Sequence, residues 1–348
     1  MSAPLNLRDL ERIAGGLLEP GAQAYFAGGA HDEVCLAENE AAWARRKLLP
    51  RVLVDVGALD TATTLLGTAV TMPVGIAPTA QHGLAHPDAE AATARAAAAA
   101  GVLYCASTMS TLPVERIGAA GSGPRWFQLY IQRDRAATLE LVARARAAGF
   151  TALVLTVDTP VAGVRERDAR VGAAAARQTF GNLGYSGSGD ALGAYVAGLF
   201  DPSVTWDDLS WLRAAAGMPL VLKGIMTAAD ARLACEHGAD AVWVSNHGGR
   251  QLDRTPATAD VLEEVAGAAA GRAEVYVDGG IRRGLDVVTA LALGARAVFV
   301  GRPVLYALAC DGQAGVTLAL EMLRAELRNA MALLGAPSVA DVRRSHVI

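Results

Sequence analysis

From Val74 onward the chain alternates between short apolar runs and longer segments rich in Ala, Leu and Arg. Each apolar run ends abruptly in polar or glycine residues, which is typical of strands buried on both faces. Strands that alternate with helical segments indicate parallel βαβ units. Eight such strands are predicted, at residues 74–77, 103–107, 126–129, 152–156, 220–223, 241–245, 275–278 and 297–300. Eight units in succession predict an α/β fold, a closed (β/α)8 TIM barrel.

Helix boundaries support this periodicity. Thr227 and Asp230 have the spacing of a capping box at a helix start. Gly149 and Gly238 are predicted helix stops before the fourth and sixth strands. The last helix carries one apolar face that is expected to be core or a subunit contact, made of Val316, Leu320, Leu323, Leu327, Met331 and Leu334.

The pattern divides the chain into a lead-in, a barrel and one long loop. Residues 1–73 predict an N-terminal helical extension, with a helix over residues 5–18 that Pro20 and Gly21 break. The barrel is expected at about 74–310, so residues 1–348 form a single domain. The loop at about 166–204, after strand four, is unusually long, and such loops are commonly lids or binding loops. We predict a lid, against the alternative of an inert insertion.

Composition narrows the class of protein. The net charge is −4 and basic residues are dispersed, which argues against a nucleic-acid partner. The four cysteines are far apart and form no metal-binding or disulfide pattern. No run reaches 18 apolar residues and no signal pattern is present, so neither a membrane span nor export is expected. We therefore expect a cytoplasmic protein with no metal site.

Catalytic groups of such barrels lie at the carboxyl ends of the strands. The sixth strand delivers His247 and Arg250 there, with Gly248 and Gly249 between them. A His moves protons near neutral pH, and an Arg holds a carboxylate with two parallel hydrogen bonds. Adjacent glycines allow a sharp turn or a close approach to a flat ligand.

The ends of the last two strands predict a phosphate site. Gly279, Gly280 and Arg282 follow strand seven, and Gly301 and Arg302 follow strand eight. Backbone N–H groups and a helix N-terminus at these loops bind phosphate in this fold. On this ground we expect a cofactor or substrate that carries a phosphate.

Taken together, the strand-end motifs resemble the FMN-dependent L-2-hydroxy acid oxidase and dehydrogenase family over essentially the whole chain. The most specific of them is the run Ser245-Asn246-His247-Gly248-Gly249-Arg250-Gln251-Leu252-Asp253. It is accompanied by Ala77-Pro78-Thr79-Ala80, Gln128-Leu129-Tyr130, Thr156-Val157-Asp158-Thr159-Pro160 and Asp278-Gly279-Gly280-Ile281-Arg282.

The resemblance implies oxidation of an L-2-hydroxy acid to a 2-oxo acid, with FMN as electron acceptor. It gives His247 the role of base, for either the α-carbon proton or the hydroxyl proton while hydride passes to the flavin. Asp158 would orient and stabilise the imidazole, although a capping role in its turn is the alternative. Tyr130 would contact the substrate oxygen, and Lys223 would stabilise negative charge on the flavin.

Binding roles follow in the same way. Arg165 and Arg250 are expected to hold the substrate carboxylate, with Tyr25 as a further hydrogen bond. The expected FMN contacts are Pro78, Thr79, Ala80, Ser107, Gln128, Thr156, Lys223, Ser245, Asp278, Gly279, Gly280, Arg282, Gly301 and Arg302.

Three positions depart from the glycolate oxidases of this family. Met109 stands where they carry Trp, Ala162 where they carry a Leu-type residue, and Val164 where a basic residue precedes the Arg. Smaller and more adaptable walls predict a substrate larger than glycolate, either aromatic such as mandelate or a longer aliphatic acid.

The sequence leaves the electron acceptor and two other classes of function open. The electrons pass either to O2, giving H2O2, or to another acceptor, and we expect O2. An FMN-dependent isomerase is a second class, but it has no need for the two Arg residues together with His247. A catalytically silent FMN-binding barrel is a third. The resemblance also implies a homotetramer or octamer.

Overall fold

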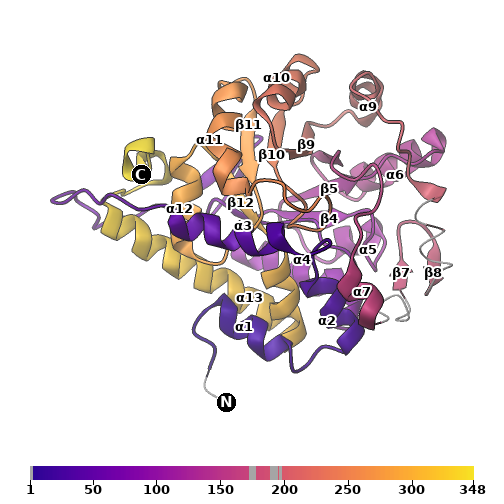
Figure 1. Ribbon diagram of the computed structural model, residues 1–348, viewed down its shortest axis with the longest axis horizontal. Helices are drawn as coiled ribbons and strands as arrows, with labels where there is room; N and C mark the ends of the chain where they lie inside the picture. Colours follow the sequence, from indigo (N-terminus) through magenta and orange to yellow (C-terminus); the bar gives the residue numbers. More distant parts are fainter. Residues whose placement is uncertain (1–2, 172–177, 189–194, 196–197) are drawn as a thin grey trace.

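The computed structural model describes residues 3–171, 178–188, 195 and 198–348. Its centre is a closed barrel of eight parallel strands in the order β10-β11-β12-β3-β4-β5-β6-β9 (Figure 1). The strands are β3 (Val74–Ile76), β4 (Tyr104–Ser107), β5 (Arg125–Leu129), β6 (Leu153–Thr156), β9 (Leu220–Ile225), β10 (Ala241–Val244), β11 (Glu274–Val277) and β12 (Ala297–Val300). All eight predicted strands and the predicted TIM barrel are confirmed.

Side chains fill the barrel interior, as its apolar strands require. Trp126, Trp243, Tyr276 and Phe299 meet there, and the ring centroids of Trp243 and Phe299 lie 3.9 Å apart. Because the interior is packed, a ligand binds only at an end of the barrel.

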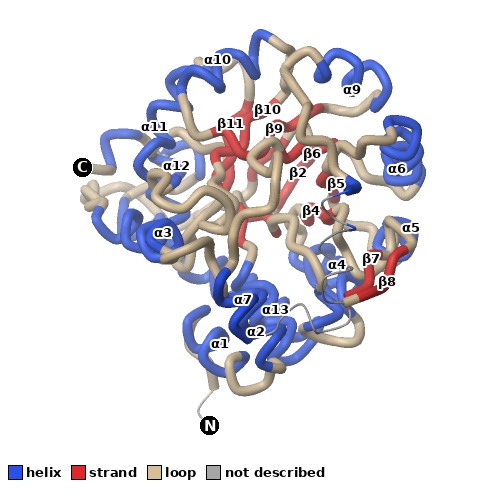
Figure 2. The backbone as a smooth tube through the Cα atoms, turned by 45° about the vertical axis from the view of Figure 1, so that its right-hand side comes forward, coloured by secondary structure: helices blue, strands red, loops and turns tan. Residues whose placement is uncertain are grey.

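Helices surround the barrel on all sides (Figure 2). They are α4 (Ala89–Ala100), α5 (Val114–Ala119), α6 (Arg135–Ala147), α9 (Asp208–Ala216), α10 (Ala228–Glu236), α11 (Thr258–Ala269), α12 (Gly284–Ala292) and α13 (Arg302–Leu334). The Thr227 hydroxyl accepts from the Asp230 N–H, as the capping prediction requires. Gly149 and Gly238 adopt φ angles of 83° and 77° at their helix ends.

Helix α13 is long and apolar enough to cross a membrane by length and composition, but 61% of that window is buried inside the protein. The apolar face predicted for its second half is entirely buried, so of the two predicted roles it serves as core. Non-helical angles at Asp311 and Gly312 kink the helix.

The N-terminal extension differs in part from the prediction. Helix α1 (Leu7–Ala14) ends earlier than expected, and Pro20 begins a second helix, α2 (Pro20–Ala27). Proline is favoured in a first helical turn because its missing N–H needs no partner there. Helix α3 (Val34–Arg45) follows. An unpredicted hairpin, β1 (Thr63–Leu65) and β2 (Thr68–Val70), packs Leu65 and Val70 onto the barrel interior.

The predicted loop at 166–204 contains regular structure. Helix α7 (Glu166–Val171) lies beside α2 (Figure 2), and β7 (Gln178–Phe180) pairs with β8 (Tyr185–Gly187). Residues 172–177, 189–194 and 196–197 lie outside the described residues. The described parts of this segment are therefore ordered into a helix and a hairpin, and its role as a lid stays a prediction. Short 3-10 helices are η1 (His82–Leu84), η3 (Val339–Asp341) and η4 (Arg344–His346).

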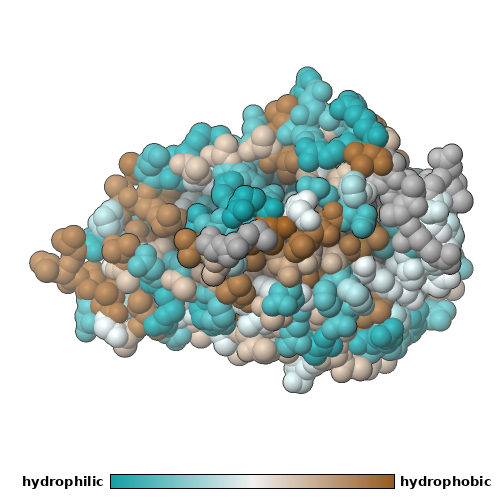
Figure 3. Space-filling model, turned by 90° about the horizontal axis from the view of Figure 1, so that it is seen from below, coloured by the Kyte–Doolittle hydropathy of each residue, from teal (hydrophilic) through white to brown (hydrophobic). Residues whose placement is uncertain are grey.

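One loop carries exposed apolar side chains. Val52 and Leu53 are 80% and 102% exposed, and Leu49 and Val54 are also exposed. This loop protrudes at the left of Figure 1, and apolar side chains gather at the same end in Figure 3. Assembly into a tetramer or octamer stays a prediction.

Candidate active site

The strand ends enclose a cavity of about 350 Å³, which we call the central cavity. This volume lies within the range of small-molecule sites. Most of the predicted site residues line it: Tyr25, Pro78, Thr79, Ala80, Ser107, Met109, Tyr130, Ala162, Arg165, Lys223, His247, Arg250, Asp278, Gly279, Gly280, Arg282, Gly301 and Arg302. Asp158, Gln128, Thr156 and Ser245 are not part of this lining; three of them hold lining residues by hydrogen bonds, as described below.

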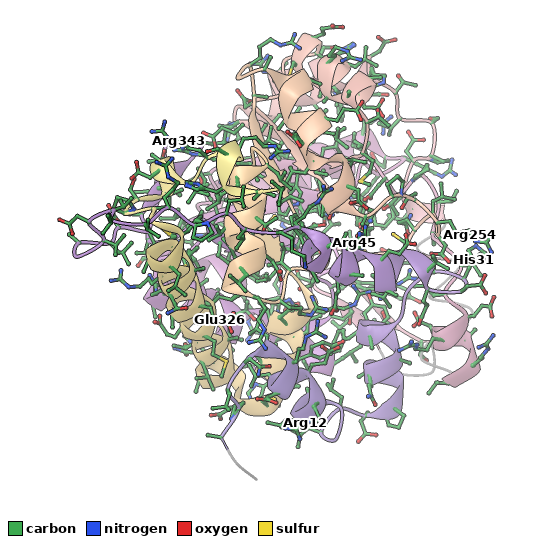
Figure 4. All side chains as sticks on the ribbon, turned by 60° about the vertical axis from the view of Figure 1, so that its left-hand side comes forward. Arg12, His31, Arg45, Arg254, Glu326 and Arg343 are labelled. Atoms are coloured by element: carbon green, nitrogen blue, oxygen red, sulfur yellow. The ribbon has the colours of Figure 1, made fainter. Side chains whose placement is uncertain are left out.

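The loop after β10 presents His247 in an unusual backbone conformation. His247 has a φ of 58°, and Gly248 and Gly249 follow with 62° and 74°. A left-handed residue other than glycine is strained and is often found at functional sites. The Ser245 hydroxyl accepts from the His247 N–H at 3.1 Å, which holds this turn. Later in the same loop, Arg254 lies beside His31 (Figure 4) and pairs with Asp32 at 3.1 Å.

Asp158 is placed to orient the His247 ring. His247 Nδ1 lies 2.9 Å from Asp158 Oδ1, so its other ring nitrogen, Nε2, is left for a ligand. Burial raises the pKa of Asp158, but the charges of His247 and Lys223 outweigh it and leave the pKa below its ordinary value. The carboxylate therefore stays ionised and holds the ring by its hydrogen bond to Nδ1. Thr159 also donates to Asp158 Oδ1, at 2.9 Å.

Two guanidinium groups meet over the Tyr25 ring. Arg250 lies 5.0 Å and Arg165 5.9 Å from its centroid. Burial, together with the charge of Arg165, lowers the pKa of Arg250 to about 9. Arg250 donates to the carbonyls of Tyr25 and Gly28. Asp168 is a carboxylate near Arg250, and it forms a long ion pair of 3.9 Å with Arg165. An anion placed between the two Arg residues would relieve their repulsion.

Lys223, Ser245 and Asp278 form a buried chain at the barrel rim. Lys223 Nζ donates to Ser245 Oγ at 2.8 Å, and Ser245 donates to Asp278 at 2.7 Å. Lys223 also pairs with Asp278 at 3.4 Å. Burial lowers the pKa of Lys223, but Asp278 and Asp158 raise it above its ordinary value. Lys223 is therefore a permanent positive charge inside the cavity wall.

Gln128 offers a donor that the protein itself leaves unpaired. Its carbonyl oxygen accepts from the Ser107 hydroxyl at 3.1 Å and from the Thr108 N–H. Its Nε2 is buried with no hydrogen-bond partner among the described residues. A buried unpaired donor is costly unless a ligand accepts from it. An FMN ring carbonyl would provide such an acceptor, and Lys223 in the cavity wall would supply positive charge to the ring, so the residues fit this cofactor.

Residues of both predicted phosphate loops line the central cavity, although their Arg side chains are engaged by the protein. Arg282 pairs with Glu40 at 2.9 Å. Arg302 donates to the carbonyls of Phe26, Gly28 and Gly248. Gly279 and Gly280 have φ angles of 93° and 83°, which turn the chain away from β11. The loops meet at one side of the cavity, where a phosphate would compete with these partners.

Sequence reasoning missed several supporting residues. Gln251 donates to the carbonyls of Asp158 and Val161, and these bonds connect the loop after β10 to the loop after β6. Asn246 exchanges hydrogen bonds with Asn39 of α3 at 2.8 and 2.9 Å. Gln251 and Asn246 both lie in the motif around His247, and their place in that motif is the sequence signal that could have identified them. Phe200, whose ring centroid lies 4.8 Å from that of Tyr130, had no such signal.

The comparisons with known proteins agree with this geometry. The FMN-dependent dehydrogenase family matches residues 14–348. Glycolate oxidase 3 of Arabidopsis thaliana is 47% identical over 98% of this chain and 95% of its own length. Glycolate oxidase of Spinacia oleracea is 46% identical over the same shares. A crystal structure of mandelate oxidase has a TM-score of 0.93 at 43% identity, covering 99% of this chain and 98% of its own. The chain therefore belongs to the FMN-dependent dehydrogenase family and is an FMN-dependent 2-hydroxy acid oxidising enzyme.

Proposed function

We propose that this enzyme oxidises an (S)-2-hydroxy acid larger than glycolate to its 2-oxo acid, with His247 as the proton acceptor and O2 as the final electron acceptor. The observation that carries the proposal is the His247–Asp158 pair in the same cavity as the Arg165 and Arg250 guanidinium groups. The His247–Asp158 pair would remove a proton, and the two guanidinium groups would bind the carboxylate of an acid.

FMN, when bound, takes up the two electrons of the oxidation. Gln128 and Lys223 would hold its ring, and Lys223 supplies positive charge where negative charge develops. The loops at Gly279 and Gly301 would hold its phosphate. The protein's own groups do the remaining work, which is binding, orientation and proton transfer.

Arg165 and Arg250 hold the substrate carboxylate by parallel hydrogen bonds. Tyr130 lines the same cavity, and burial raises the pKa of its phenol well above the ordinary value. It therefore donates a hydrogen bond as a neutral group to the substrate oxygen. His247 Nε2 takes the proton, and Asp158 stabilises the imidazolium that forms. A positioned base of this kind is worth about 10²- to 10⁴-fold in rate.

The cavity wall supports a substrate larger than glycolate. Met109 and Ala162 both line it. By the family resemblance, these are the positions where glycolate oxidases are expected to carry bulkier groups. Methionine adapts its shape to a neighbouring group, and alanine leaves space. The relatives named above include both glycolate and mandelate oxidases, so glycolate is the alternative that an experiment must exclude.

The test is a comparison of kcat/KM for glycolate, (S)-mandelate and 2-hydroxyoctanoate with the FMN-loaded enzyme. We expect both larger acids to exceed glycolate. A preference for glycolate would refute the size argument and leave the family assignment intact. Oxygen consumption with H2O2 formation is expected for an oxidase. Fast flavin reduction followed by slow reoxidation in air would instead indicate a dehydrogenase.

A further inference from the structure

A second cavity of about 450 Å³, here called the lateral cavity, adjoins the central cavity. It lies between the carboxyl ends of β6 and β9 and the start of α9, which are neighbours in Figure 2. The two cavities share five lining residues: Tyr130, Thr159, Pro160, Phe200 and Pro202. The lateral cavity therefore borders the site that holds His247, and these five residues form the boundary between the two.

The walls of the lateral cavity include the apolar residues Leu155, Val204, Leu209, Leu222 and Ile225, together with the polar residues Thr156, Asp201, Thr205 and Asp230. Its described lining includes no Lys, Arg or His. Protein interiors are close-packed and contain few voids of such size. The apolar part of these walls favours an apolar ligand group over water.

Both carboxylates of the lateral cavity are engaged by the protein. Asp201 pairs with Arg135 at 2.7 Å and accepts from Ser203. Asp230 accepts from the Thr227 hydroxyl at 2.8 Å. Neither one is free to hold a cationic ligand group, and no cation is present to hold a second carboxylate. The chemistry therefore selects an uncharged group.

Phe200 forms a fixed part of the wall between the two cavities. The Asp201 N–H donates to the Ile131 carbonyl at 3.0 Å, and the Arg133 N–H donates to the Leu199 carbonyl at 2.9 Å. These bonds attach residues 199–201 to the segment after β5. The half-buried Phe200 ring then lies against Tyr130, so these two rings stand together at the boundary between the cavities.

We propose that the lateral cavity binds the uncharged, apolar end of the substrate, and that this enzyme selects 2-hydroxy acids with a long unbranched or arylalkyl side chain. This inference rests on the proposed function. Arg165 and Arg250 hold the carboxylate in the central cavity, and the side chain extends past the boundary formed by Tyr130 and Phe200 into the lateral cavity. Each buried methylene then adds up to about fourfold to kcat/KM.

The experiment measures anaerobic flavin reduction by straight-chain (S)-2-hydroxy acids from lactate to 2-hydroxydodecanoate. The wild type is compared with Val204→Trp, because Val204 lines the lateral cavity alone. Thr205→Phe is the second variant, since Thr205 is an exposed lining residue that tolerates change more readily. Leu318→Trp places the same new ring on the exposed side of α13 as a control. Bound FMN is measured by absorbance in every variant.

We expect kcat/KM in the wild type to rise with chain length over several methylenes. The ratio of 2-hydroxydecanoate to lactate should fall at least tenfold in Val204→Trp or Thr205→Phe and stay unchanged in Leu318→Trp. A flat chain-length profile in the wild type, or an equal ratio in the cavity-filling and control variants, would overturn the inference. A flavin that no 2-hydroxy acid reduces, lactate included, would instead refute the proposed function itself.

Discussion

Replacing Asp158 by Asn tests how the site prepares its base. The carboxylate lies 2.9 Å from His247 Nδ1 and is buried, so the change removes a charge-assisted hydrogen bond without removing volume. Such a bond contributes about 1.5–3 kcal/mol, which is roughly 10- to 150-fold in rate. The amide also favours the wrong ring tautomer, and the equivalent change in a serine protease costs about 10⁴-fold.

We therefore expect Asp158→Asn to bind FMN and to reduce it about 10²- to 10⁴-fold more slowly with saturating (S)-mandelate. Stopped-flow absorbance under anaerobic conditions measures this step. Asp260→Asn is the matched control, because Asp260 is a carboxylate of α11 that pairs with Arg45 and Arg46 and does not line the central cavity. A reduction rate within threefold of the wild type would refute the orienting role of Asp158.

The same change alters stability at low pH. Because the folded pKa of Asp158 lies below its ordinary 3.8, the carboxylate stabilises the fold above that pH, and this contribution is lost as the pH falls through the folded pKa. Denaturant unfolding of Asp158→Asn should therefore depend less on pH below about 4 than the wild type does. An identical pH dependence in both proteins would show that the native pair does not hold the charge.

Three further predictions concern other parts of the site. Since the pKa of Arg250 is about 9 in the free protein, kcat/KM should fall as the pH rises through that value, whereas Arg250→Met should lower kcat/KM at every pH and lose this limb. Lys223→Met leaves Asp278 buried without a cation, and it should lower the unfolding free energy by about 3 kcal/mol and lower the flavin reduction potential. Gly280→Ala puts a methyl group against the Asn39 carbonyl at a positive φ of 83°, and it should cost about 2 kcal/mol or more by denaturant unfolding. A wild-type pH dependence of kcat/KM in Arg250→Met would contradict the role of Arg250. An unchanged unfolding free energy or flavin potential in Lys223→Met would contradict that of Lys223, and an unchanged unfolding free energy in Gly280→Ala would contradict that of Gly280.

The barrel was predictable because its signal is local. Parallel strands are buried on both faces, so each reads as a continuous apolar run, and their shared polarity brings the residues after each run to one rim. His247, Arg250, Lys223 and Asp278 come from three strands and all line one cavity for this reason.

Features that depend on distant contacts were not predictable. The hairpin of β1 and β2 owes its place to Leu65 and Val70 packing on the barrel interior, which no local pattern reveals. Helix α1 packs against α13, a contact that no pattern within residues 5–18 reveals. Phe200 faces Tyr130 because residues 199–201 hydrogen-bond to the segment after β5. Tyr130 and Phe200 are 70 positions apart in the chain, so no local pattern reveals this contact.

The central claim is that His247 removes a proton from a 2-hydroxy acid while FMN accepts the electrons. The most direct measurement mixes wild type and His247→Gln, each loaded with FMN, with (S)-mandelate in the absence of air and follows the flavin absorbance. The account predicts rapid bleaching of the wild type and bleaching at least about 100-fold slower in the variant, with equal FMN content. Near-normal bleaching of the variant, or no bleaching of the wild type by any 2-hydroxy acid, would contradict it.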